Sequence, residues 1–199
     1  MTGIRRVVAA TTRGAAVVTL AACVSSSAAT PTASRKPSPE AVAAANDVLA
    51  ASATLHNAAG AEVGTAQLTS DEDGGVHVVL RVHDMSPGPH GVHFHAMGVC
   101  DESGAFASAG GHFNPLNHLH GLENPAGPHA GDMPNLTVDA DGTGTMDAVT
   151  GRATLRSGPA SLFDADGTAI VVHAAADDQK TDPSGNSGAR VACGVVQGQ

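Results

Sequence analysis

Residues 76–83 read VHVVLRVH and alternate between apolar and polar side chains. Successive side chains of an extended chain point to opposite faces, so this stretch predicts a half-buried β-strand. One face carries the apolar set Val76, Val78, Leu80 and Val82. The other face carries His77, Val79, Arg81 and His83. We expect the first face to contribute to the core and the second to meet solvent.

The same extended pattern recurs along the chain, before and after this stretch. Further strands are expected at residues 49–56, 61–69, 91–95, 136–138, 144–150, 169–173 and 190–196. Turn sequences rich in glycine, asparagine and aspartate separate them, and the chain contains 24 glycines and 11 prolines. Closely spaced strands of this kind predict an all-β fold, a sandwich or a barrel.

Charge and aromatic content exclude one broad class of function. The 199 residues include 10 Lys plus Arg, 19 Asp plus Glu, four Phe, no Trp and no Tyr. A nucleic-acid-binding protein needs a basic surface and usually aromatic or arginine stacking groups. We therefore expect no nucleic-acid partner.

The N-terminus has the composition of an export sequence. Arg5, Arg6 and Arg13 precede an apolar run at residues 14–22, which is too short to cross a bilayer. The run ends in LAAC, similar to a bacterial lipobox, so residues 1–22 are expected to be a signal peptide. Cys23 would then carry a lipid such as palmitate and anchor the protein to the cell membrane. Ordinary secretion with loss of Cys23 is the alternative, and Sec and twin-arginine export both remain open.

A polar segment separates this leader from the strands. Residues 24–40 are mostly Ser, Ala, Thr and Pro, a composition that cannot bury enough surface to fold. We expect residues 23–45 to be a lipid-anchored flexible linker and residues 46–199 to form the folded domain. The expected location is the extracytoplasmic face of a bacterial membrane.

Histidines concentrate where the strand pattern is interrupted. His93 and His95 lie two residues apart, so both imidazoles would share one face of a strand. The interval from Ala96 to Pro134 lacks alternation and is long for an unstructured loop. It contains His112, His118, His120, His129 and Asp132. Three histidines and one aspartate would suit a tetrahedral zinc site, and His173 ends another apolar strand.

Two cysteines remain in the domain once Cys23 is assigned to the lipid anchor or to the cleaved peptide. Cys100 and Cys193 would most simply form one disulfide in an exported protein. Buried free thiols and metal-binding thiolates are the alternatives at this point.

Five motifs occur in the order found in one enzyme family: HGVHFHAMG, GGHFNP, HGLENPAGPHAGDMPN, AIVVHAAADD and SGNSGARVACGV. Together they resemble the copper/zinc superoxide dismutases, most of all the bacterial exported branch, over residues 50–197. The resemblance implies an immunoglobulin-like Greek-key β-barrel with long metal-binding loops. It also implies a disulfide between Cys100 and Cys193.

The resemblance further implies the site residues. The copper ligands would be His93, His95, His112 and His173. The zinc ligands would be His112, His120, His129 and Asp132. Asp177 would hydrogen-bond one histidine of each set, and Arg190 would attract and orient the anion. The register of the family selects His120 over His118.

The implied activity is conversion of superoxide to dioxygen and hydrogen peroxide by Cu(II)/Cu(I) cycling, with His112 as a proton carrier. Its biological role would be protection against extracellular superoxide. The alternative is a non-catalytic protein that binds or buffers copper and zinc outside the cytoplasm. Lys180 would either attract the anion or balance Asp177, Asp178 and Asp182. The sequence leaves the oligomeric state open, a homodimer included.

Overall fold

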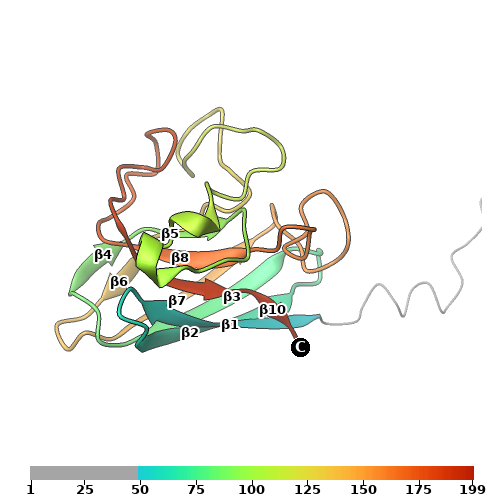
Figure 1. Ribbon diagram of the computed structural model, residues 1–199. Helices are drawn as coiled ribbons and strands as arrows, with labels where there is room; N and C mark the ends of the chain where they lie inside the picture. Colours follow the sequence, from blue (N-terminus) through green and yellow to red (C-terminus); the bar gives the residue numbers. More distant parts are fainter. Residues whose placement is uncertain (1–48) are drawn as a thin grey trace, which may run out of the picture. The chain divides into compact units, whose positions relative to one another are not determined.

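The computed structural model describes residues 49–199, and these residues form an almost wholly β structure (Figure 1). The strands are β1 (Ala50–Asn57), β2 (Glu62–Ser70), β3 (Val76–Val82), β4 (Gly88–His90), β5 (Val92–His95), β6 (Leu136–Val138), β7 (Gly144–Thr150), β8 (Ala169–His173), β9 (Arg190–Val195) and β10 (Gln197–Gly198). Two short 3-10 helices, η1 (Glu102–Gly104) and η2 (Ala107–Ala109), complete the regular elements of this part of the chain.

The strands form one antiparallel sheet that nearly closes into a barrel. Its order is β4-β6-β7-β3-β2-β1-β9-β8-β5, with β10 paired to the start of β1. The two edge strands, β4 and β5, are separated in sequence only by Gly91. One extended segment therefore pairs with β6 through its first half and with β8 through its second half. This exchange of partners joins the two ends of the sheet and confirms the predicted all-β barrel.

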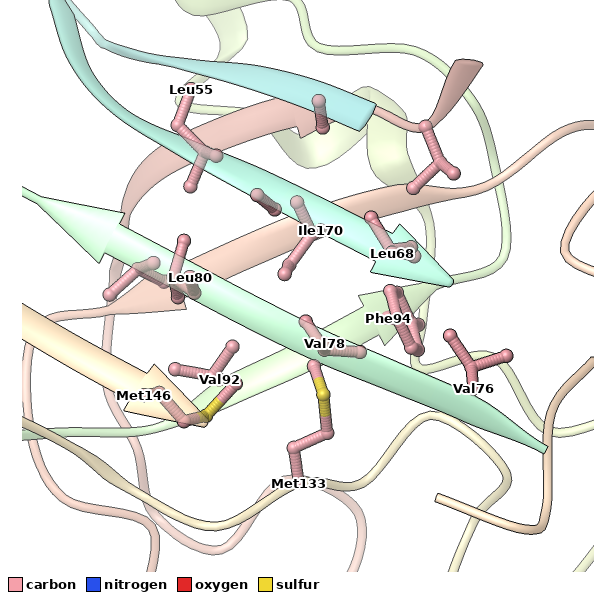
Figure 2. Packing of buried hydrophobic residues seen from close by; sticks show 14 of the residues in the cluster. Leu55, Leu68, Val76, Val78, Leu80, Val92, Phe94, Met133, Met146 and Ile170 are labelled. Atoms are coloured by element: carbon pink, nitrogen blue, oxygen red, sulfur yellow. The ribbon is translucent and has the colours of Figure 1, made fainter. Parts of the chain in front are cut away.

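The core fills the inside of this barrel (Figure 2). Alternate residues of β3 are buried, as the pattern of residues 76–83 predicted, and Leu80 has no exposed surface. Leu55 and Leu68 of the neighbouring strands, and Phe94 and Ile170 from β5 and β8, belong to the same buried cluster. Burial of such side chains contributes about 1.5–3 kcal/mol each. The core thus fixes the inward side chains Val92 and Phe94 of β5. Because side chains alternate along a strand, it also fixes the direction of the outward side chains.

The predicted strands all occur, with ends that differ by one residue or not at all. Strands β6, β7 and β8 have the predicted bounds. Strands β4 and β10 were not predicted. Strand β4 reads Gly-Pro-His, and glycine and proline are depleted in strands, while β10 has only two residues. Both are defined as strands by their pairing, β4 with β6 and β10 with β1.

Two long irregular segments lie on the same side of the barrel, beside β5 and β8 (Figure 1). The first runs between β5 and β6, and the second between β8 and β9. No helix among residues 49–199 has the length and apolar character needed to span a membrane. The expected signal peptide 1–22, the lipid attachment at Cys23, the whole linker 23–45 and the domain start at residue 46 lie outside the described residues and remain predictions.

Candidate metal centre and anion site

Strand β5 places two imidazoles outside the barrel. Val92 and Phe94 point into the core, so the alternation of the strand sends His93 and His95 to the opposite face. Both histidines are nevertheless buried, with 0% and 1% of their surface exposed. The long segments cover them, which gives a site outside the barrel but shielded from solvent.

The β5–β6 segment reaches this site by pairing with β5. Bridges join His93 to Asp132 and His95 to His112. The amide of Phe94 donates to Gly131 O at 2.9 Å. Backbone pairing therefore brings His112 and Asp132 beside the two strand histidines, although they lie far along the loop.

An irregularity in the β8–β9 ladder delivers the remaining histidine. The register shifts between Val172 and His173, and His173 pairs with Arg190. Such bulges redirect a side chain at the end of a strand. His93, His95, His112 and His173 then present one ligand atom each, all within 4.8 Å of one another.

Hydrogen bonds determine which nitrogen of each ring faces the centre of this group. His95 Nδ1 contacts Gly110 O at 2.9 Å, and His173 Nδ1 contacts Gly188 O at 3.1 Å. Their Nε2 atoms lie 3.4 Å apart. The buried His93 Nδ1 and His112 Nε2 have no hydrogen-bond partner. Buried polar atoms are rarely left unpaired, so these two atoms fit a bound metal ion.

A second group surrounds one oxygen of Asp132. Its Oδ1 lies 3.1 Å from the Nδ1 atoms of both His112 and His120, and 3.3 Å from His129 Nδ1. Three imidazoles and one carboxylate form the donor set that zinc commonly takes in proteins. His118 lies outside this group, since its side chain contacts Pro128 O at 3.1 Å.

A buried carboxylate connects the two groups. Asp177 Oδ2 lies 2.7 Å from His93 Nε2, and its Oδ1 lies 3.0 Å from His120 Nε2. Because Asp177 is acceptor-only when ionised, it places the proton of each ring on the outer nitrogen. The Nδ1 atoms of both histidines are thereby left free to bind metal.

The electrostatics of the two groups differ. Burial lowers the pKa of His93 to about 3, that of His95 to about 2 and that of His173 to about 4. Burial also lowers the pKa of His120, but hydrogen bonds to Asp132 and Asp177 outweigh it and raise that pKa to about 9. The first group is thus held neutral, as ligation requires, while the second is surrounded by negative charge.

Arg190 provides a guanidinium beside the first group. Its Nη1 donates to Phe106 O and its Nη2 donates to Gly110 O. The carbonyl oxygen of Gly110 also contacts His95 Nδ1, so Arg190 and His95 share this hydrogen-bond partner. The Cys100–Cys193 disulfide is present and ties the same loop to β9.

Several supporting residues were missed by sequence reasoning. The side-chain amide of Asn135 donates to Asp177 O at 2.9 Å, and Asn135 Oδ1 accepts from the main-chain amide of Asp177 at 2.8 Å. Arg152 donates to Asp132 O at 2.8 Å. Their partners are 20 or more residues away, so no spacing indicated them. Glu123 was missed as well: its carboxylate lies 2.7 Å from Lys180 Nζ and raises the pKa of Lys180, to which Asp178, one of the three expected partners, also contributes.

Comparison with known proteins agrees with this geometry. The family model for copper/zinc superoxide dismutase (SODC) matches residues 62–196. The chain is 44% identical to superoxide dismutase [Cu-Zn] 1 of Aquifex aeolicus over 147 residues, which cover 73% of this chain and 86% of the relative. It is 42% identical to the superoxide dismutase-like protein YojM of Bacillus subtilis, over 72% of this chain and 74% of that protein.

A solved structure shows the same fold. The crystal structure of a SOD-like protein from Bacillus subtilis matches with a TM-score of 0.66 and 40% identity, covering 72% of this chain and 96% of that one. Barrel, disulfide, neutral imidazole group and carboxylate-bearing second group therefore occur together in a chain with extended similarity to known enzymes. This chain belongs to the copper/zinc superoxide dismutase family of oxidoreductases.

Proposed function

We propose that this protein is an exported, membrane-anchored superoxide dismutase that protects the cell against extracellular superoxide. The reaction consumes two superoxide anions and two protons, and yields one dioxygen and one hydrogen peroxide. One anion loses an electron and the other gains it. The observation that carries the proposal is the convergence of four neutral imidazoles, two of them with unpaired buried nitrogens, beside the guanidinium of Arg190.

The donor atoms suggest which residues hold which metal. His93 Nδ1 and the Nε2 atoms of His95, His112 and His173 would hold copper. The Nδ1 atoms of His112, His120 and His129, with Asp132 Oδ1, would hold zinc. Copper supplies reversible one-electron chemistry when bound, and zinc a fixed charge without redox chemistry.

Arg190 would attract and orient the anion. The chain as a whole carries 19 acidic and 10 basic residues, so its overall field repels superoxide. A local positive charge must then guide the substrate, and such focusing raises association rates by roughly 10–10³-fold. The two carbonyls that accept from Arg190 hold the guanidinium in place.

His112 would carry a proton. It is the imidazole that the copper and zinc sets assigned above share, with Nδ1 beside Asp132 and Nε2 facing the other three histidines of the copper set. Because Nε2 has no protein partner, a proton placed there can pass only to a species at the centre of the copper set. Asp132 keeps the ring oriented throughout.

Superoxide turnover by the metal-loaded full chain tests the enzymatic proposal. We expect Arg190→Ala to lower kcat/KM by roughly 10- to 100-fold, and Arg190→Lys to retain part of it. Arg81→Ala is the matched control, since Arg81 is an exposed arginine on the outer face of β3. Absence of turnover by the metal-loaded chain, once a chelator has removed free copper, would support metal buffering instead. Equal rates for Arg190→Ala and Arg81→Ala would remove Arg190 from its role.

Membrane attachment is tested separately. The basic leader, the apolar run and the LAAC sequence support lipidation of Cys23. We expect Cys23→Ser to move the protein from the membrane fraction to the soluble fraction, while Ser25→Ala leaves it on the membrane. A wild-type protein recovered in the soluble fraction would contradict the anchor.

A further inference from the structure

The three imidazoles around Asp132 Oδ1 differ in what their outer nitrogens contact. The outer nitrogen of His112 faces the other histidine group, and that of His120 contacts Asp177 at 3.0 Å. The outer nitrogen of His129 faces a different carboxylate. His129 Nε2 lies 3.8 Å from Asp182 Oδ1.

Asp182 already contacts the same site by another route. The main-chain amide of His120 donates to Asp182 Oδ1 at 2.7 Å, across a sequence separation of 62 residues. One carboxylate oxygen therefore lies between the backbone of one histidine and the ring of another. Asp182 belongs to the β8–β9 segment, whereas both histidines belong to the β5–β6 segment.

We propose that Asp182 is a positioning residue of the zinc site, which holds the main chain of His120 and orients the ring of His129 through Nε2. This inference rests on the zinc set assigned under the proposed function. Asp177 and Asp182 would then act as a pair, each fixing one histidine of that set from outside.

The chemistry of ligation explains why His129 needs such a partner. An imidazole that binds metal through Nδ1 keeps its proton on Nε2, and that N–H requires an acceptor. His129 is only 6% exposed, so water is a poor substitute. A carboxylate in this position fixes the ring and strengthens the ligand, and its loss typically lowers metal affinity 10- to 100-fold.

The distance between His129 Nε2 and Asp182 Oδ1 limits the size of the expected effect. A separation of 3.8 Å is too long for a hydrogen bond, so the proposed role requires His129 Nε2 and Asp182 Oδ1 to come closer when the site is filled. The Asp182 side chain is 45% exposed, and solvent weakens its interaction. We therefore expect an effect near the lower end of the range, about tenfold.

Equilibrium competition for zinc between the full chain and a chromophoric chelator tests this role. Asp182→Ala should lower zinc affinity about tenfold. Asp182→Asn should lower it less, because its amide oxygen can still accept from His120. Glu123→Gln is the control: it removes the exposed Lys180–Glu123 pair, which joins the same two segments without touching a histidine ring. We expect that control to bind zinc like the wild type.

The visible spectrum of Co(II) bound in place of zinc adds a readout of ligand geometry. We expect altered band intensities for both Asp182 variants and an unchanged spectrum for Glu123→Gln. Wild-type affinity in Asp182→Ala, or an equal loss in Glu123→Gln, would overturn the inference. A wild-type chain that fails to retain zinc at all would overturn the zinc set itself, so the two failures are distinguishable.

Discussion

Gly185 occupies a position against Asp177 that no other residue can take. A Cβ atom at Gly185 would lie 1.7 Å from Asp177 Oδ1 and 2.8 Å from His120 Nε2. Its φ of 61° also lies in the left-handed region. Gly185→Ala must therefore displace the carboxylate that joins His93 to His120.

The loss of unfolding free energy follows from those contacts. A hydrogen bond that involves a charged group contributes about 1.5–3 kcal/mol, and Asp177 makes two such bonds to buried histidines. Alanine in the left-handed region adds about 1–2 kcal/mol of strain. Gly185→Ala should therefore reduce the free energy of unfolding by about 4 kcal/mol or more.

Urea unfolding of the metal-free, disulfide-intact protein near pH 7 measures this effect. Gly60→Ala is the matched control, because Gly60 has a φ of 78° and nothing within 4 Å of the added Cβ. Gly60→Ala should lose only the part of the unfolding free energy that the left-handed backbone strain costs. If both variants lost the same free energy, the displacement of Asp177 would contribute nothing and the reasoning would be refuted.

Three further predictions concern the same metal-free protein. Burial lowers the pKa of His93 to about 3 and that of His95 to about 2, whereas both have a pKa of 6.5 in the unfolded chain. Below pH 6.5 the unfolded chain therefore binds more protons than the folded chain. The free energy of unfolding should then fall as pH decreases from about 6.5 towards 3, and a urea midpoint that stays constant over this interval would contradict it. Cys193→Ser, which opens a loop of 93 residues closed with Cys100, should lower stability by up to about 4.7 kcal/mol, and dithiothreitol should do the same to the wild type. Leu80→Ala should lower stability by about 2–5 kcal/mol through a cavity in the core while zinc affinity stays unchanged; a parallel loss of zinc binding would show that the core and the metal site are not independent.

Local pattern predicted the strands well where one face is buried. Alternation identified β3 and β7, because side chains two residues apart lie on the same face of a strand, whereas a continuous apolar run indicated β8. It did not reveal that Gly91 divides one extended segment between two partner strands. That exchange depends on pairing with residues 45 or more positions away, which no local pattern contains.

The site likewise has features that the sequence predicts and features that only the folded structure determines. Residue types and motif order predicted which histidines and carboxylates gather and where a disulfide forms. The roles of individual ring nitrogens, the contacts of Asp182, Asn135 and Arg152, and the pairing of Lys180 with Glu123 came only from the folded chain. A hydrogen bond depends on distances of a few tenths of an ångström between segments brought together by packing, and the linear order of residues does not contain those distances.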